Sequence, residues 1–245
     1  MDPRPSLIDK RVKNVRRVIA VAAGKGGVGK SSVASMLALE LSKRGYKVGL
    51  MDLDFYGPSA HVILGARGIQ PSEDKGIVPP EVSGIKFMSI VYYAGDSPCP
   101  IRGIDVSNSI IELLTITRWG DLDFLVLDMP PGFGDSTLDV IRLLKKTEFV
   151  VVYTPSKVVI ETVEKLVKML KENKVSILGL VENMKTRGSD SAKRELKDFG
   201  IPFLGSIWLD KGFENSTGSP EKLLKTHFIK DIRSIIPKLK ARKVR

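Results

Sequence analysis

Residues 24–32 read G-K-G-G-V-G-K-S-S and constrain the fold of this 245-residue chain more than any other segment. They match the pattern G-x-x-x-x-G-K-S/T, in which glycines let successive backbone N–H groups turn inward around phosphate oxygens. A run of β-forming residues, 17–23, precedes the loop. Apolar residues at helical spacing follow it as far as Gly45, which is suited to end a helix. Strand, glycine-rich loop and helix therefore occur in the order that a phosphate-binding site requires.

The side chains of this loop have distinct expected roles. Lys30 is expected to reach the β- and γ-phosphates of a nucleotide, and Ser31 to ligate Mg²⁺ through its hydroxyl. The predicted nucleotide-binding residues of the loop are Gly24, Lys25, Gly26, Gly27, Val28, Gly29, Lys30, Ser31 and Ser32. The alternative is a glycine-rich turn without a ligand, which the flanking strand and helix make the weaker interpretation.

Further strand-like runs alternate with helical stretches along most of the chain. They lie at 47–52, 85–90, 123–128, 148–153, 176–182 and 203–207. Such alternation predicts an α/β fold of three layers, with a mainly parallel sheet and helices on both faces. We expect one domain at 15–240, a basic extension at 1–14 and a basic tail at 241–245.

Two strand ends carry the carboxylates that chemistry at a phosphate site needs. Residues 52–59 read D-L-D-F-Y-G-P-S, and residues 128–132 read D-M-P-P-G. Asp54 is predicted to orient the attacking water, and Asp52 to help hold the metal shell or the loop. Asp128 is predicted to hold Mg²⁺ mainly through water. The alternative for Asp52 and Asp54 is that both only cap the next segment.

The net charge of +11 is concentrated at both ends of the chain. Basic ends can bind nucleic acid or anionic lipid, but more often they are solvated, and no aromatic residues are interleaved with them here. Nucleic acid is therefore a permitted but less favoured partner. No stretch of about 20 apolar residues occurs, and the first residues lack the apolar core of a secretion signal. We expect no membrane span and a cytoplasmic location.

Three motifs together resemble the Mrp/ApbC family of deviant Walker ATPases, which is related to MinD, ParA and nitrogenase iron protein. The motifs are G-K-G-G-V-G-K-S, D-L-D-F-Y-G-P-S and D-M-P-P-G-F-G-D, and the resemblance covers residues 15–225. It implies the P-loop NTPase fold and an ATP-sandwich homodimer, in which Lys25 of one subunit reaches the phosphates bound by the other. Asp54 would position the hydrolytic water, and hydrolysis would separate the subunits. The family's adenine-binding asparagine would be Asn183, with further base contacts near 207–210.

The sequence departs from the family pattern at two places, which bear on binding of an iron–sulfur cluster and on recognition of the nucleotide base. Members that carry a transient iron–sulfur cluster have a C-x-x-C pair shortly after E-N-M, whereas residues 185–189 here read K-T-R-G-S. A dimer would supply two thiolates from the single Cys99, fewer than the four that such clusters normally need, so this chain alone is not expected to hold a cluster. Trp208 stands where similar proteins place a proline, and filling a core gap is favoured over stacking on adenine.

The favoured interpretation is a slow Mg²⁺-dependent ATPase of the Mrp type, coupled to an unknown protein partner or cargo and connected with iron–sulfur protein maturation. One alternative is a MinD/ParA-like positioning ATPase that acts on DNA or a surface through basic patches. Another is a partner-binding module with negligible turnover. A C-terminal amphipathic membrane helix is not expected, because Pro237 interrupts the apolar residues there.

Overall fold

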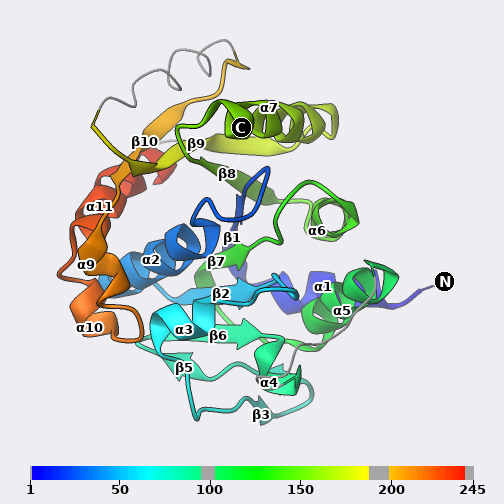
Figure 1. Ribbon diagram of the computed structural model, residues 1–245. Coiled ribbons are helices and arrows are strands. Elements are labelled where there is room, and N and C mark those ends of the chain that lie inside the picture. The colour runs from blue at the N-terminus through cyan, green and yellow to red at the C-terminus, as the bar shows by residue number, and fades with distance from the viewer. Residues whose placement is uncertain (1, 95–102, 188–198, 241–245) are drawn as a thin grey trace.

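An eight-stranded sheet forms the centre of the protein in the computed structural model, which describes residues 2–94, 103–187 and 199–240 (Figure 1). The strand order is β10-β9-β8-β1-β7-β2-β6-β5, and all neighbours pair in parallel except β5 with β6. The strands are β1 (Val15–Ala22), β2 (Val48–Asp52), β5 (Glu81–Val82), β6 (Ile85–Ser89), β7 (Leu122–Asp128), β8 (Thr147–Tyr153), β9 (Ser176–Lys185) and β10 (Phe203–Trp208). The predicted α/β fold and the predicted strands are thus confirmed.

The central strands are buried on both faces. Every residue of β8 is buried, as are the last residues of β1 and of β7. Because helices cover both faces of a parallel sheet, its inner strands form continuous apolar runs rather than alternating patterns. These strands end in Asp52 and Asp128, which pair with each other at the carboxyl ends of β2 and β7, beside the loop that follows β1.

Helices pack on both faces of this sheet (Figure 1). One group consists of α2 (Lys30–Lys43), α3 (Ala60–Leu64), α9 (Lys211–Glu214), α10 (Pro220–Leu223) and α11 (His227–Lys240). The other consists of α1 (Arg4–Val12), α5 (Gly103–Ile116), α6 (Asp135–Leu143) and α7 (Lys157–Glu172). The short elements β3 (Ser72–Glu73), β4 (Ile77–Val78) and α4 (Val91–Ala94) lie outside the central sheet.

The helix α11 corrects the expectation that Pro237 interrupts the C-terminal apolar residues. The helix continues through Pro237, and its apolar side chains at 232, 235, 236 and 239 are buried. They pack on β10 and α2, so burial of this face stabilises the helix despite the hydrogen bond that proline removes. In the part of the chain that the structure describes, no helix is long and apolar enough to cross a bilayer.

The N-terminal segment packs against the rest of the domain. Ile8 of α1 is fully buried, and α1 contacts α5 and α6. The Arg11 guanidinium donates hydrogen bonds to the carbonyl oxygens of Thr115 at 2.8 Å and Lys75 at 3.0 Å. Part of the predicted basic extension therefore contributes to the core and ties two distant segments together.

Candidate functional site

The loop between β1 and α2 needs glycine at specific positions. Gly27 and Gly29 have φ angles of 79° and 80°, in the left-handed region that favours glycine. A Cβ atom at Gly24 would lie 2.6 Å from the carbonyl oxygen of Thr162, so only glycine lets this loop approach α7 so closely. The loop leads directly into the N-terminus of α2, where backbone N–H groups and the helix dipole favour an anion.

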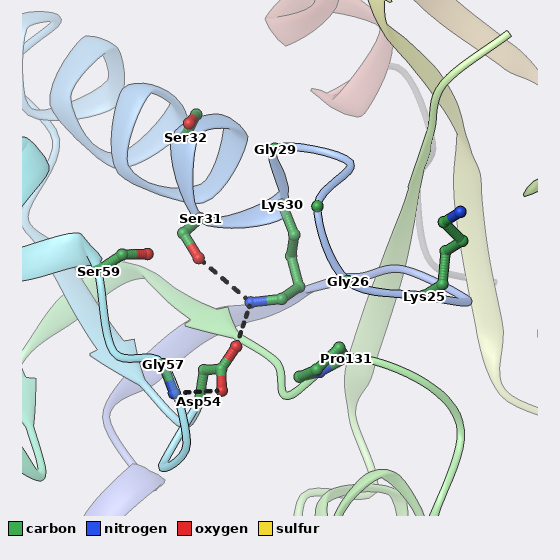
Figure 2. Close-up of a pocket in the computed structure, with 11 residues that line it drawn as sticks. Lys25, Gly26, Gly29, Lys30, Ser31, Ser32, Asp54, Gly57, Ser59 and Pro131 are labelled. Atoms are coloured by element: carbon green, nitrogen blue, oxygen red, sulfur yellow. Dashed lines mark hydrogen bonds and ion pairs between the residues drawn. The ribbon is translucent and has the colours of Figure 1, made fainter. Parts of the chain in front are cut away.

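A cavity of about 230 Å³ opens beside this loop (Figure 2). Its lining residues are Lys25, Gly26, Gly27, Gly29, Lys30, Ser31, Ser32, Asp54, Gly57, Ser59 and Pro131. The structure thus gathers most of the predicted loop residues and Asp54 around one space. Gly57, Ser59 and Pro131 were not predicted as site residues, although the motifs at 52–59 and 128–132 contain them.

Lys30 is a buried cation that contacts three polar side chains. Its Nζ lies 2.6 Å from Asp128 Oδ1 and 3.7 Å from Asp54 Oδ2. It also donates a hydrogen bond to Ser31 Oγ at 3.3 Å. Figure 2 shows the Lys30 side chain directed toward Asp54 and Ser31. One ammonium group therefore links the residues predicted to hold metal and to orient water.

Asp128 lies at the end of β7 and is fully buried. Burial raises the pKa of its carboxyl group, and the Lys30 ammonium opposes that rise. Its Oδ2 atom has no hydrogen-bond partner among the residues that the structure describes. Buried polar atoms are normally hydrogen-bonded, so this free carboxylate oxygen fits a group that binds from the cavity, such as the water shell of a cation.

Asp52 holds the loop that follows β2. Its Oδ1 accepts a hydrogen bond from the N–H of Asp54 at 3.0 Å, and its Oδ2 accepts from the N–H groups of Ser59 at 3.1 Å and Ala60 at 3.2 Å. Burial, followed by the nearby Asp128 carboxylate, raises the pKa of Asp52 to about 8. Asp52 was predicted to help hold either the metal shell or the loop, and its hydrogen bonds correspond to the second role. The bond from the Ala60 N–H also caps the first turn of α3.

Asp54 and Lys25 differ in how far the structure fixes them. The N–H of Gly57 donates to Asp54 Oδ1 at 3.2 Å, which orients the carboxylate at the cavity wall. Lys25 lines the same cavity but is exposed, and Figure 2 shows its side chain directed away from Lys30 and Asp54. The Lys25 ammonium is therefore accessible from outside this chain.

Asn183 contacts the loop itself. It is buried, and its Nδ2 donates a hydrogen bond to the carbonyl oxygen of Val28 at 2.9 Å. A Cβ atom at Gly29 would lie 2.2 Å from that Nδ2. The predicted base contact thus lies directly against the phosphate-binding loop, a contact that no local pattern could reveal because 155 residues separate the two groups.

Trp208 does not fill a core gap, and that prediction is wrong. The residue is 45% exposed, and Lys185 Nζ lies 5.2 Å from its ring centroid. Trp208 is the last residue of the edge strand β10, where no further strand covers it. Cys99 lies outside the described residues, as do residues 188–198 of the stretch after β9.

Within the described ranges, no group of three or more His, Cys, Asp or Glu side chains could hold a metal ion by itself.

Comparisons with known proteins show the family of this chain. Residues 14–241 match the family model ParA, described as NUBPL iron-transfer P-loop NTPase. The chain is 38% identical to an iron-sulfur cluster carrier protein of Aquifex aeolicus, over 91% of this chain and 66% of the relative. It is 36% identical to that of Saccharolobus solfataricus, over 90% of this chain and 80% of the relative. The match to the Pseudomonas fragi protein covers 61% of that protein, so the chain spans under two thirds of some relatives.

Solved structures agree as well. The nucleotide-binding protein of Archaeoglobus fulgidus, in complex with ADP, superposes with a TM-score of 0.76 at 32% identity, covering 90% of this chain and 92% of that one. MinD of Pyrococcus horikoshii with Mg-ADP has a TM-score of 0.69 at 18% identity, covering 92% and 96%, and shows the shared fold. The family match over nearly the whole chain, with the three motifs gathered around one phosphate-binding cavity, shows that this chain belongs to the NUBPL iron-transfer P-loop NTPase family, the Mrp/ApbC type.

Proposed function

We propose that this chain binds Mg·ATP in the cavity beside residues 24–32 and hydrolyses it slowly as a homodimer, in a cycle coupled to a partner or cargo. The observation that carries the proposal is the set of contacts around Lys30. A buried ammonium lies 2.6 Å from a buried carboxylate, beside a hydroxyl and a second carboxylate. These groups would provide both the cation for phosphates and the ligands for a metal.

The residues present fit a nucleotide and Mg²⁺. Backbone N–H groups of the loop and the α2 N-terminus would bind the phosphates, and Lys30 would turn from Asp128 to them. Ser31 would provide a hydroxyl ligand, and the unpartnered Asp128 Oδ2 would hold a metal-bound water. When bound, Mg²⁺ neutralises charge that develops on the phosphates during transfer.

Hydrolysis requires an oriented water and additional positive charge. Asp54 would orient the water, and two observations support this role: the Gly57 N–H donates to one of its oxygens, and Asp52 accepts hydrogen bonds from the surrounding loop. Once Lys30 turns to the phosphates, Asp54 Oδ2 loses its contact with that ammonium and can accept a hydrogen bond from water. Lys25, exposed and directed outward, would supply positive charge to a nucleotide bound by the second subunit.

The distribution of exposed apolar residues supports a homodimer in which the carboxyl ends of the strands, beside the phosphate-binding loop, face the second subunit. Four exposed apolar residues follow the carboxyl ends of β2, β7, β8 and β10, and a fifth lies in the last residues of β9. They are Tyr56, Phe133, Val158 and Leu209, and Met184 of β9. These strand ends lie on the same side of the sheet as the phosphate-binding loop. Exposed apolar patches on otherwise polar surfaces mark interaction sites. A second copy that faces this edge would bury them and bring Lys25 to the opposite site.

The names of the relatives suggest that the cargo is an iron–sulfur cluster. Each chain has one cysteine, and such clusters normally need four thiolates, so a dimer would have to share the cluster with a partner protein. We therefore propose assistance to iron–sulfur protein maturation as an ATPase or carrier, with the cluster as shared substrate.

Phosphate release by the purified protein tests the proposal. The wild type should release phosphate from Mg·ATP well above the rate of Lys30→Ala, and Asp54→Ala should fall to that background. A wild-type rate equal to that of Lys30→Ala would overturn hydrolysis and favour a binding module without turnover.

Size-exclusion chromatography with Mg·ATP separates the roles of Lys25 and Asp54. Lys25→Ala should retain ATP binding but lose ATP-driven dimerisation and turnover. Asp54→Ala should accumulate as an ATP-bound dimer, because it keeps Lys25 but cannot orient water. Normal hydrolysis by Lys25→Ala would contradict the cross-subunit role.

A further inference from the structure

Exposed cations gather at the end of the sheet opposite to the phosphate-binding loop. They lie in or beside the turns that lead from α1, α6 and α7 into β1, β8 and β9, which are adjacent strands. The residues are Lys13, Arg16, Lys145, Lys146 and Lys174, and all are exposed. We call this surface the basic edge. Three of its members belong to neither terminal cluster of the sequence, so the fold itself brings them together.

The register of the strands places these cations in one row. Val18 of β1 pairs with Thr147 of β8, directly after Lys146. Glu148 of β8 pairs with Ser176 of β9, two residues after Lys174. Neighbouring strands lie about 4.8 Å apart, so the row from β1 to β9 spans about 10 Å. The Arg17 guanidinium also donates to the Leu239 carbonyl oxygen at 3.0 Å, which brings the basic end of α11 to the same place.

Acidic side chains lie beside the basic edge, but in the described residues they form no ion pair with its cations. The Glu148 carboxylate is buried and paired with Arg17 at 2.7 Å, and Asp121 accepts a hydrogen bond from Asn14 at 2.7 Å. Glu172, at the end of α7, and Asp121 are exposed, and Asp123 of β7, level with Arg16 in the pairing of β1 with β7, is partly exposed. Among residues 2–94, 103–187 and 199–240, no cation of the basic edge forms an ion pair with a carboxylate.

We propose that the basic edge binds the phosphate backbone of double-stranded nucleic acid. A duplex presents closely spaced phosphates to lysine and arginine, and such contacts need no base-stacking aromatic group. Single strands are usually bound with aromatic platforms, and membrane surfaces with apolar anchors. In the described residues, the turns before β1, β8 and β9 expose neither an aromatic nor a large apolar side chain.

The basic edge and the nucleotide site can be occupied at the same time. They lie at opposite ends of β1 and β8, and strands of this length extend about 25 Å. Cations near a helix C-terminus interact favourably with the helix dipole. The alternative role of Lys145, Lys146 and Lys174 is therefore to stabilise α6 and α7, without binding nucleic acid. That structural role predicts a change in melting temperature without any effect on duplex binding.

Fluorescence anisotropy with a short labelled duplex DNA, without nucleotide, tests the inference. We compare the wild type with the double variant Lys145→Glu/Lys146→Glu. The control is Lys222→Glu/Lys225→Glu, which makes the same charge change at exposed sites on and just after α10. The basic-edge variant should bind at least about 10-fold more weakly, with a salt slope lower by about 2, while the control stays within about twofold of the wild type.

Several outcomes would overturn the inference. They are wild-type binding that is absent or insensitive to salt, equal losses in both double variants, or a lower melting temperature of the basic-edge variant with unchanged duplex affinity. Binding to phosphatidylserine vesicles without binding to duplex would also overturn it. If Lys145→Glu/Lys146→Glu does not fold, Lys174→Glu serves the same comparison with an expected loss of about 3-fold and a slope change of about 1. None of these results depends on ATP hydrolysis.

Discussion

The part of the cavity predicted to bind phosphates and the part predicted to bind the base are held by different forces. On the phosphate side, buried charges contact one another, with Lys30 between Asp128 and Asp54. On the predicted base side, the groups are neutral or exposed: Asn183 donates to a backbone carbonyl, and Trp208 is half-exposed next to Lys185. The two sides come from β1, β2 and β7 on one hand and from β9 and β10 on the other.

This difference indicates where the site tolerates change. A buried carboxylate requires a nearby cation, so a metal with phosphates can replace Lys30 at Asp128, but an apolar side chain cannot. A single neutral hydrogen bond contributes only about 1 kcal/mol. We therefore expect substitutions on the phosphate side to have large effects and those on the base side to have small ones.

The largest effect is expected for Lys30→Met. Without the ammonium that contacts the phosphates, the nucleotide loses a charge-assisted interaction of about 3 kcal/mol, so Mg·ATP affinity should fall by at least about 100-fold. The same change leaves Asp128 and Asp54 without their cation, so Mn²⁺ should bind this variant in the absence of nucleotide. Electron paramagnetic resonance of free Mn²⁺ measures this directly. Lys25→Met is the control and should bind no Mn²⁺ alone, and equal Mn²⁺ binding by the wild type would contradict the account.

Gly29→Ala should have the next largest effect. A Cβ here meets both a φ of 80° and Asn183 Nδ2 at 2.2 Å, so the free energy of unfolding should fall by about 2 kcal/mol or more. Gly45→Ala is a matched control, because Gly45 has a φ of 83° but a Cβ added there would meet nothing within 4 Å. It should lose about 1 kcal/mol. Urea unfolding compares them, and equal losses would show that Asn183 does not constrain the loop.

Asn183→Ala should weaken nucleotide binding moderately. Without its hydrogen bond to Val28, the loop loses about 1 kcal/mol of support, and Mg·ADP affinity should fall by about 5-fold. Asn173→Ala removes a similar bond, to the Met169 carbonyl oxygen at 2.9 Å on an exposed helix end, and should leave affinity unchanged. Calorimetry that finds no difference between the two variants would remove Asn183 from the site.

Trp208→Phe should have the smallest effect. Its ring does not line the cavity, so Mg·ATP affinity should stay within about twofold of the wild type. The buried Trp119 then remains as the single tryptophan, so the fluorescence spectrum should lose its solvent-exposed component. A tenfold loss of affinity for Mg·ATP would instead assign base stacking to Trp208.

Local sequence patterns predicted the loop and the strands because neighbouring residues in the chain determine these conformations. The glycines at 27 and 29, the apolar run of β1 and the start of α2 depend on neighbouring residues. The contact of Lys30 with Asp128 depends on the pairing of β1 with β7, across 98 residues. The same limit applies to Asn183 on Val28.

Trp208 and Pro237 differ from the sequence-based expectation for the same physical reason. The sequence favours a core position for Trp208, but its exposure follows from the position of β10 at the edge of the sheet. Pro237 is a residue that normally interrupts a helix, but tertiary packing of α11 on β10 and α2 preserves the helix here. In both cases the arrangement of elements, which no short motif specifies, determines the outcome.

A calorimetric titration with Mg·ATP tests most directly whether the cavity at residues 24–32 binds a nucleotide through Lys30. We expect saturable binding to a single site per chain for the wild type and no measurable heat for Lys30→Ala at the same concentrations. Absence of heat from the wild type, or equal heat from both proteins, would contradict this expectation.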